Sequence, residues 1–296
     1  MSNRAAFWVL VFMNIIWGGS YAVSKWVLNY IPPTFLAATR FLLGGILLLF
    51  FSEGKTFQIS KKHWMDLTWV YGLGISLSFI AQYQGIKLTT ALKASMEMTL
   101  EPLFVILLAI SVLKEPLKLQ TLFGLTMSVL GTVLLVFDGK SITQIWGELK
   151  NGGQILGDIL MLFSIFLGSA YSIFSKPLTK KMGPIKSTAW GCILSSVMLL
   201  PLVALEIQSG CKFEFNTSVF ASIFFLGVIC TALGYALWNK ILVGMPASEM
   251  AITLNIQPIA GVAIGMIFLG ERIGLIGCLG GIIILVGIWM VPFSSV

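Results

Sequence analysis

Two acidic residues stand inside an otherwise apolar stretch of the chain. Glu97 and Glu101 lie between residues 91 and 113, four positions apart, so a helix places them on one face. A carboxyl group at membrane depth is energetically costly and usually faces a cavity, a proton path or a substrate. We expect Glu97 to contact a proton or an amine. For Glu101 a structural alternative stays open, because it precedes Pro102 and can anchor the backbone freed where proline kinks the helix.

Aromatic and amide side chains form a second group of candidates. Rings that stack and amides that hydrogen bond can together hold a small amphipathic ligand. Packing or an interfacial belt is the alternative for each of these residues taken singly. We expect Tyr83, Tyr235 and Trp238 to line a cavity. The whole group comprises Asn14, Trp17, Gln82, Tyr83, Tyr171, Tyr235, Trp238 and Gln257.

One basic residue, Arg40, lies near the start of an apolar run at residues 33–51. Its guanidinium group could attract an anionic part of a substrate. Its long side chain could equally extend to the membrane interface, and we favour this second interpretation.

The composition shows what must position these residues. Hydrophobic residues make up 57% of the 296-residue chain and charged residues only 10%, whereas soluble domains contain about 25% charged residues. The chain is therefore predicted to be an integral membrane protein. Runs of roughly 20 apolar residues are long enough to cross a bilayer. The runs that qualify are 5–25, 33–51, 65–86, 91–113, 117–137, 154–175, 187–205, 217–239, 247–269 and 273–292.

An internal repeat organises these runs. Glu101-Pro102 matches Gln257-Pro258 and Glu115 matches Glu271, both at an offset of 156 residues (257 − 101). Each repeat holds five spans, an odd number, so the two copies enter the membrane from opposite sides. We therefore predict an all-α membrane protein of ten transmembrane helices in two inverted five-helix repeats. The first repeat covers 1–137 and the second 154–296. The connecting segment 138–153 is either a short interfacial helix or a plain linker.

The distribution of Lys and Arg predicts the orientation. Of the 19 basic residues, eleven fall on the side of the N-terminus and seven on the other side, Lys93 among them, while Arg40 lies within a span. An excess of basic residues marks the cytoplasmic side. We expect a multi-pass protein of the cytoplasmic (inner) membrane with both termini in the cytoplasm.

Several classes of function lack their signatures. The basic residues lie in short connections, so nucleic acid is not an expected partner. The four cysteines have no metal-binding spacing, and the single histidine, His63, excludes a Ser-His triad. Gly139-Lys140-Ser141 lacks the upstream glycine of a nucleotide-binding loop. We predict no cofactor, no metal site and no catalytic residue, and energy must come from a gradient or from the substrate itself.

The chain resembles the drug/metabolite transporter superfamily, in its ten-helix branch with two EamA-type repeats. The likeness is carried by segments 17–21, 32–33, 40–41, 101–103, 113–115, 233–238, 257–258 and 269–272, and includes the doubled Glu/Gln-Pro pattern. It covers nearly the whole chain. It implies cytoplasmic termini, a central cavity and the export of metabolites such as amino acids, often coupled to protons. Two departures are Gln257, where the family commonly has Glu, and Lys114 in place of the usual glycine.

We therefore predict a secondary transporter that exports amino acids or related compounds by alternating access. Its partners are a small-molecule substrate, the lipid bilayer and, as an open option, protons, and a monomer suffices for this architecture. The alternatives are an importer of one salvaged metabolite such as a nucleoside, sugar or vitamin, an intramembrane enzyme, and a passive channel. The enzyme is disfavoured because the acidic residues are scattered along the sequence.

Overall fold

The computed structural model describes residues 3–51, 59–113, 123–124, 126–127, 130–131, 133–134, 139–151, 153–244, 250, 253–254 and 256–289. These residues form helices and short connections, and no strand occurs among them. Glu115 and most of the predicted span 117–137 lie outside the described residues.

Five helical stretches of the described chain are long and apolar enough to cross a membrane. Three are single helices: α2 (Pro33–Phe50), α9 (Gln154–Met182) and α10 (Pro184–Gln208). The others are Ala5–Val27 within α1 (Asn3–Val27), and Thr217–Gly244, which is built from three helical segments. Two shorter apolar helices, α14 (Ile256–Leu269) and α15 (Leu275–Trp289), follow. The described residues are helical and apolar as predicted for an integral membrane protein, and ten spans in two inverted repeats stay a prediction.

Two long helices of the described chain widen into π-helix near their middle. One runs through α3 (Lys61–Leu67), the π-helix η1 (Thr68–Ile75) and α4 (Ser76–Leu88). The other runs through α11 (Thr217–Phe224), the π-helix η3 (Phe225–Leu233) and α12 (Gly234–Gly244). The two π-segments begin 157 residues apart (225 − 68), close to the offset of the sequence repeat. Such segments are frequent at functional sites because they redirect side chains.

The helix that carries both glutamates is interrupted between them. α5 (Ala91–Glu97) passes into a 3₁₀ turn, η2 (Met98–Leu100), and then into α6 (Glu101–Leu113). Pro102 has no N–H group for the carbonyl of Met98, and the N–H of Glu101 bonds to that carbonyl instead. The local change of geometry turns Glu101 away from the face that Glu97 occupies.

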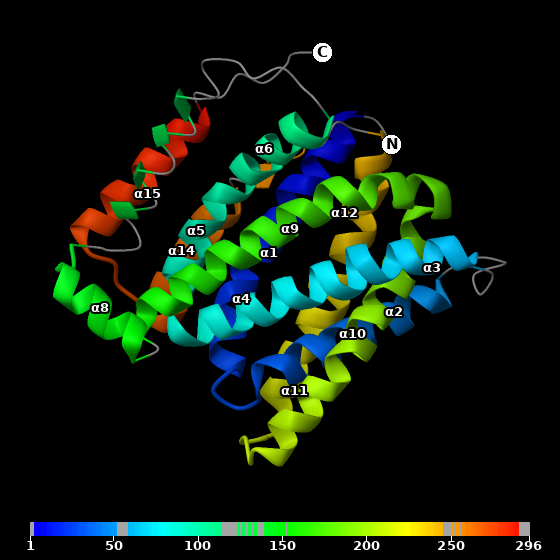
Figure 1. Ribbon diagram of the computed structural model, residues 1–296, viewed down its shortest axis with the longest axis horizontal. Helices are drawn as coiled ribbons and strands as arrows, with labels where there is room; N and C mark the ends of the chain where they lie inside the picture. The colour runs from blue at the N-terminus through cyan, green and yellow to red at the C-terminus, as the bar shows by residue number, and fades with distance from the viewer. Residues whose placement is uncertain are drawn as a thin grey trace.

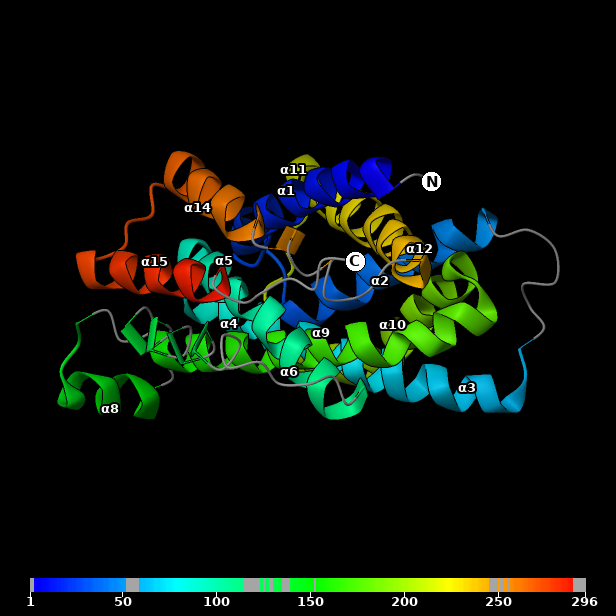
Figure 2. The same cartoon turned by 90° about the horizontal axis from the view of Figure 1, so that it is seen from above.

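The helices form a bundle that surrounds the site from several sides. Figure 2 shows α1 and α14 on one side and α6 and α9 on the opposite side, with α2 between them. α1 packs along α14, α4 along α9, and α2 along α10 (Figure 1). The segment between the predicted repeats contains a helix, α8 (Ile142–Lys150), which lies beside the start of α9 in Figure 1.

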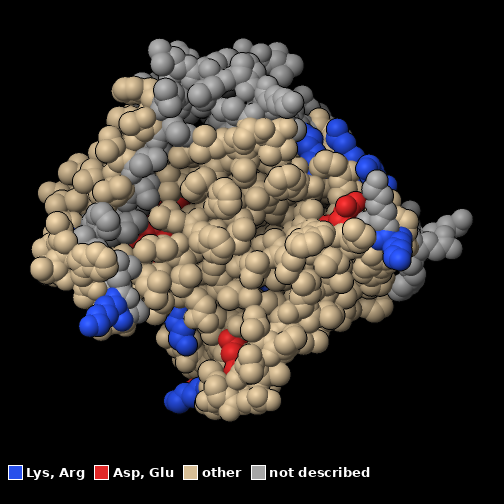
Figure 3. Space-filling view, viewed as in Figure 1, with Lys and Arg blue, Asp and Glu red and all other residues tan. Residues whose placement is uncertain are grey.

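The outer surface is suited to lipid. Large apolar side chains are exposed, including Trp8, Phe12, Trp69 and Phe268, which is 76% exposed. On the face shown in Figure 3, most charged side chains lie near the rim, and a broad surface poor in charge lies between them. A contiguous apolar surface of this kind marks contact with a membrane.

Candidate functional site

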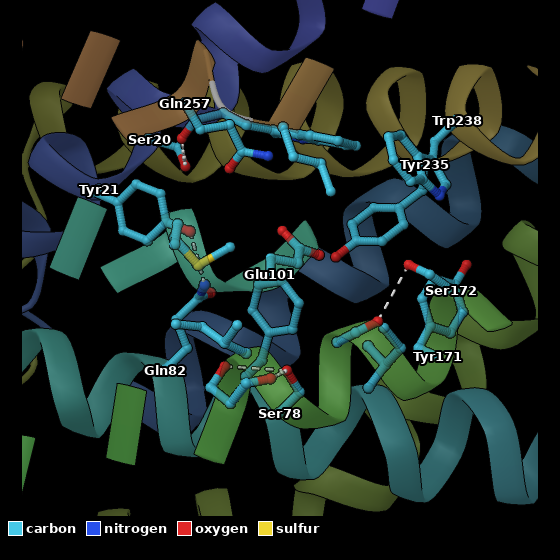
Figure 4. A pocket seen from close by; sticks show the side chains of 18 of the residues that line it. Ser20, Tyr21, Ser78, Gln82, Glu101, Tyr171, Ser172, Tyr235, Trp238 and Gln257 are labelled. Carbon is cyan, nitrogen blue, oxygen red and sulfur yellow. Dashed lines mark hydrogen bonds between the residues drawn. The ribbon is translucent and has the colours of Figure 1, made fainter. Parts of the chain in front are cut away.

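A cavity opens between the two sides of the bundle (Figure 4). Its wall draws on α1, α2, α4, α6, α9, α12 and α14, together with the segments η1 and η2. Seven of the residues singled out in the sequence contribute to this wall: Trp17, Gln82, Glu101, Tyr171, Tyr235, Trp238 and Gln257.

Aromatic rings form one wall of the cavity. The rings of Tyr235 and Trp238 each lie 5.7 Å from the ring of Trp17. Tyr171 meets Tyr235 edge to face at 5.9 Å. Trp17 is fixed because its Nε1 donates a 2.9 Å hydrogen bond to the carbonyl of Cys230, within the π-segment η3. These mutually tilted rings give a ligand an apolar aromatic wall that also carries the hydroxyl groups of the two tyrosines.

Glu101 provides the acidic group of the cavity wall. Its carboxyl oxygens have no hydrogen bond to any described residue, although its backbone carbonyl accepts one from Ser169. Figure 4 shows the carboxyl group of Glu101 and the hydroxyl group of Tyr235 pointing towards one another, and the two interact electrostatically. Glu101 thus directs its side chain into the cavity, where a ligand can reach it.

Arg40 also lines the cavity, and the favoured interpretation that it extends to the interface is wrong. The side chain is 4% exposed. Its Nε donates to Thr231 Oγ1 at 2.8 Å and its Nη1 donates to Tyr83 Oη at 2.5 Å. The guanidinium group lies 4.6 Å from the centre of the Phe79 ring. These partners compensate for the lost water inside the bundle, so Arg40 does not need to reach the membrane surface.

Two sequence candidates support the cavity from behind its wall. Tyr83 is fully buried and holds Arg40. Asn14 is fully buried and accepts a 2.8 Å hydrogen bond from Gln257 Nε2, while its own Nδ2 donates to Thr253 Oγ1 at 3.0 Å. Neither residue is part of the wall itself.

Asn239 on α12 orients a tyrosine of the wall, and sequence analysis did not place it in the site. Its Nδ2 lies 2.9 Å from the hydroxyl oxygen of Tyr171, 3.1 Å from that of Tyr71 and 2.8 Å from Thr188 Oγ1. Tyr71 belongs to η1, and its ring packs on Tyr171 at 5.0 Å. An amide group buried between three hydroxyl groups fixes the direction of the Tyr171 side chain.

Glu97 lies outside the cavity. It is fully buried on α5, and neither of its carboxyl oxygens has a hydrogen bond partner. It lies within electrostatic range of Lys93 and Asp158, which form an ion pair with one another at 3.3 Å. The sequence places Lys93 among the residues flanking the membrane, but the structure buries it at 3% exposure.

Small hydroxyl side chains complete the polar part of the wall, and these were missed as well. Ser164 and Ser172 come from α9, and Ser78 from α4. Ser78 Oγ lies 3.1 Å from Ser164 Oγ, and Figure 4 shows Ser78 on the same side of the cavity as Gln82. Spacing could have revealed them, because Ser164, Gly168 and Ser172 recur every four residues along one helix face.

Comparison with known proteins agrees with this architecture. The EamA-like transporter family matches residues 4–137 and 155–293. An uncharacterized transporter of Archaeoglobus fulgidus is 26% identical over 291 residues, covering 97% of each chain. A probable amino-acid metabolite efflux pump of Salmonella typhimurium is 25% identical and covers 99% of this chain and 96% of its own. The Escherichia coli protein of the same description is 24% identical, and the match covers 95% of this chain and 92% of that protein. One crystal structure, 15% identical, matches the fold with a TM-score of 0.68 over 98% of this chain and 96% of the other.

Proposed function

Because the chain belongs to the EamA-like transporter family, we propose that it is a secondary transporter that exports amino acids or closely related metabolites across the cytoplasmic membrane. The substrate class is inferred from one observation: an acidic residue, Glu101, and a basic residue, Arg40, line the same cavity. The relatives described as probable amino-acid metabolite efflux pumps support the same class and direction.

A zwitterion suits this pair of groups. The carboxyl group of Glu101 can accept hydrogen bonds from an α-ammonium group, and the guanidinium group of Arg40 can bind an α-carboxylate. Tyr21 and Tyr235 line the same cavity and each lies within electrostatic range of both charged residues. The rings of Trp17 and Trp238 then offer an apolar surface to the substrate side chain. Sugars and nucleosides carry neither an ammonium nor a carboxylate group, so a site with both charges does not favour them.

The transport cycle proposed here is alternating access between two inverted five-helix repeats, 1–137 and 154–296, with ten spans and both termini in the cytoplasm. The family matches the chain in two separate stretches with a gap at residues 138–154, which supports this division. The π-segments η1 and η3 support it as well, because each lies in the corresponding helix of its half. Wall residues come from both halves, so a relative movement of the halves changes access to the cavity. No catalytic role is assigned to any residue.

Counterflow in proteoliposomes tests the substrate class. Purified protein is reconstituted with a mixed pool of unlabelled amino acids inside, and uptake of each labelled amino acid is measured, with sugars and nucleosides as separate pools. We expect exchange of amino acids and its loss by about 10-fold or more in Glu101→Gln, since hydrogen bonds to charged groups contribute about 1.5–3 kcal/mol. The matched control is Glu214→Gln, in an exposed loop. Exchange confined to sugars or nucleosides, or a Glu101→Gln protein equal to wild type, would refute the proposal.

The direction of transport is tested in living cells. An exporter expressed in a sensitive strain should confer resistance to toxic amino-acid analogues. Rescue of an amino-acid auxotroph at low external supply would show an importer instead.

A further inference from the structure

A second polar cluster lies inside the bundle, apart from the substrate cavity. It joins α5 to the first turns of α9 at the end of the bundle where α1 finishes. Lys93 and Glu97 come from α5, Asp158 comes from α9, and Thr89 precedes α5. All four are buried, none more than 3% exposed. Residues of this chemistry, buried together in a membrane protein, mark a functional site by default.

The cluster contains one carboxyl group more than it has positive charge to match. Asp158 is well partnered, because Lys93 Nζ lies 3.3 Å from its Oδ2 and Thr89 donates a hydrogen bond to its Oδ1. Neither carboxyl oxygen of Glu97 meets a hydrogen bond partner at bonding geometry, and the like-charged carboxyl group of Asp158 lies beside it within electrostatic range. Burying an ionised carboxylate without donors costs several kcal/mol. A proton on Glu97 removes this penalty. Among the described residues, no positively charged group forms a hydrogen bond with the carboxyl group of Glu97.

The helical geometry allows Lys93 to change partners. Lys93 and Glu97 are four residues apart on α5, the spacing at which an ammonium group reaches a carboxylate along one helix face. Asp158 lies across the helix interface. Beneath it the backbones of α4 and α9 meet closely at Gly85 and Gly157, where an added methyl group would collide with the other helix. The pair Lys93–Asp158 therefore joins two helices, whereas a pair Lys93–Glu97 would join none.

The remaining charges near the cluster are occupied elsewhere or are distant from Glu97. Lys25 of α1 donates to the carbonyls of Ile86, Lys87 and Thr89. Glu271 accepts from the backbone N–H groups of Ala91 and Leu92. α14 contributes no charged residue between Ile256 and Leu269. Among the described residues, the charged groups that interact electrostatically with Glu97 are Lys93 and Asp158, and Lys140 interacts with Asp158.

We propose that Glu97 is a proton-binding site separate from the substrate cavity, and that its proton controls the ion pair that joins α5 to α9. With the proton bound, Lys93 pairs with Asp158 and this end of the bundle is closed. When the proton leaves to water, the Glu97 carboxylate attracts Lys93 along α5, the pair with Asp158 weakens, and α5 separates from α9. The assignment of this opening to a transport step rests on the proposed function, but the local opening itself does not.

Hydrogen exchange measured by mass spectrometry tests the opening directly. Full-length protein in detergent is labelled at about pH 5.5 and about pH 8, and each rate is corrected for the intrinsic pH dependence of amide exchange. Peptides covering residues 86–97 and 154–161 report on the interface. In wild type we expect their corrected exchange to rise about 10-fold at the higher pH, because the local opening equilibrium shifts. In Glu97→Gln, which has no proton to lose, it should stay low at both pH values.

Two further variants make the result decisive. Asp158→Asn removes the partner of Lys93 and should give fast exchange in these peptides at both pH values. Glu101→Gln is the matched control, an acid-to-amide change at the start of the next helix, α6, and should keep the wild-type pH response of these peptides. A pH response that persists unchanged in Glu97→Gln, or is absent from wild type, would overturn the proposal.

Transport gives an independent readout. If leucine or another amino acid exchanges, Glu97→Gln should lose the pH dependence of counterflow while keeping exchange at low pH. A carrier whose pH dependence is unchanged in Glu97→Gln would overturn the coupling. Absence of all flux together with the expected hydrogen exchange would refute the proposed function and leave the proton-controlled interface supported.

Discussion

The bond between Arg40 and Tyr83 is the interaction inside the bundle whose loss we expect to be most informative. Tyr83→Phe keeps the ring, which packs on Phe79 at 5.8 Å, and removes only the hydroxyl group that accepts from Arg40 Nη1. Arg40 remains buried and keeps its bond to Thr231. The change therefore leaves one guanidinium N–H group without its acceptor.

The magnitude follows from the charge on the donor. Hydrogen bonds to charged groups contribute about 1.5–3 kcal/mol, and a buried donor left alone adds its desolvation. We expect Tyr83→Phe to lower the free energy of unfolding by about 2 kcal/mol, a factor of about 30 in the equilibrium constant. Unfolding in mixed detergent and dodecyl sulfate micelles, followed by far-ultraviolet circular dichroism, measures this difference.

A control and a double-mutant cycle separate this bond from a general loss of a hydroxyl group. The ring of Tyr30 packs on Trp26 near the end of α1, and its hydroxyl group has no hydrogen bond to the described residues. Tyr30→Phe should change the free energy of unfolding by less than about 0.5 kcal/mol. Tyr83→Phe should cost less in an Arg40→Leu background, because the guanidinium group is absent. A Tyr83→Phe loss no larger than that of Tyr30→Phe would refute the reasoning.

Two packing predictions follow. Gly191→Ala should lower the free energy of unfolding by about 1–3 kcal/mol, because the added methyl group would collide with the ring of Tyr71. The control Gly147→Ala on α8, where nothing lies within 4 Å, should be neutral or stabilising by up to about 1 kcal/mol, and equal losses in both would contradict the packing. Glu271→Ala should cost about 1–2 kcal/mol, as loss of a helix cap does, and should speed amide exchange in the first turn of α5. Unchanged exchange there would contradict this capping role, and Glu271→Gln, which keeps an acceptor oxygen, should show the smaller effect.

Much of the fold follows from sequence because membrane depth imposes long apolar runs. Spans such as 33–51 and 154–175 correspond to α2 and α9. The sequence allows either a helix or a linker at 138–153, and α8 shows that this segment contains a helix. The aromatic and amide candidates were found because large polar-edged side chains in apolar runs are few.

The partners of charged residues could not be read from sequence in the same way. The sequence favours the interface for Arg40 because a lone cation in a span has no visible partner there, and Tyr83 and Thr231 lie 43 and 191 residues away. Asp158 lies inside an apolar run, which marks it as an unusual acidic residue, but the position of Lys93 at the start of a run predicts a charge that flanks the membrane. The 3₁₀ turn at Met98–Leu100 separates Glu97 from Glu101 and sends only Glu101 into the cavity. The four-residue spacing of Glu97 and Glu101 predicts that both lie on one helix face, so it does not predict their separation.

The carboxylates that cap helix starts set a constraint on how the chain is assembled. The first N–H groups of α2, at Thr34 and Phe35, bond to Glu206, which is 172 residues later than Thr34, and those of α5 bond to Glu271, 180 residues later than Ala91. At about 5–20 residues per second, the ribosome makes Glu206 roughly 10–30 s after α2 has left it. During that interval water or lipid head groups must satisfy the start of α2. The helices of the first half are thus made before the carboxylates that cap them. The first turns of α2 and α5 gain their hydrogen bond acceptors only when the second half has been synthesised and has packed against them.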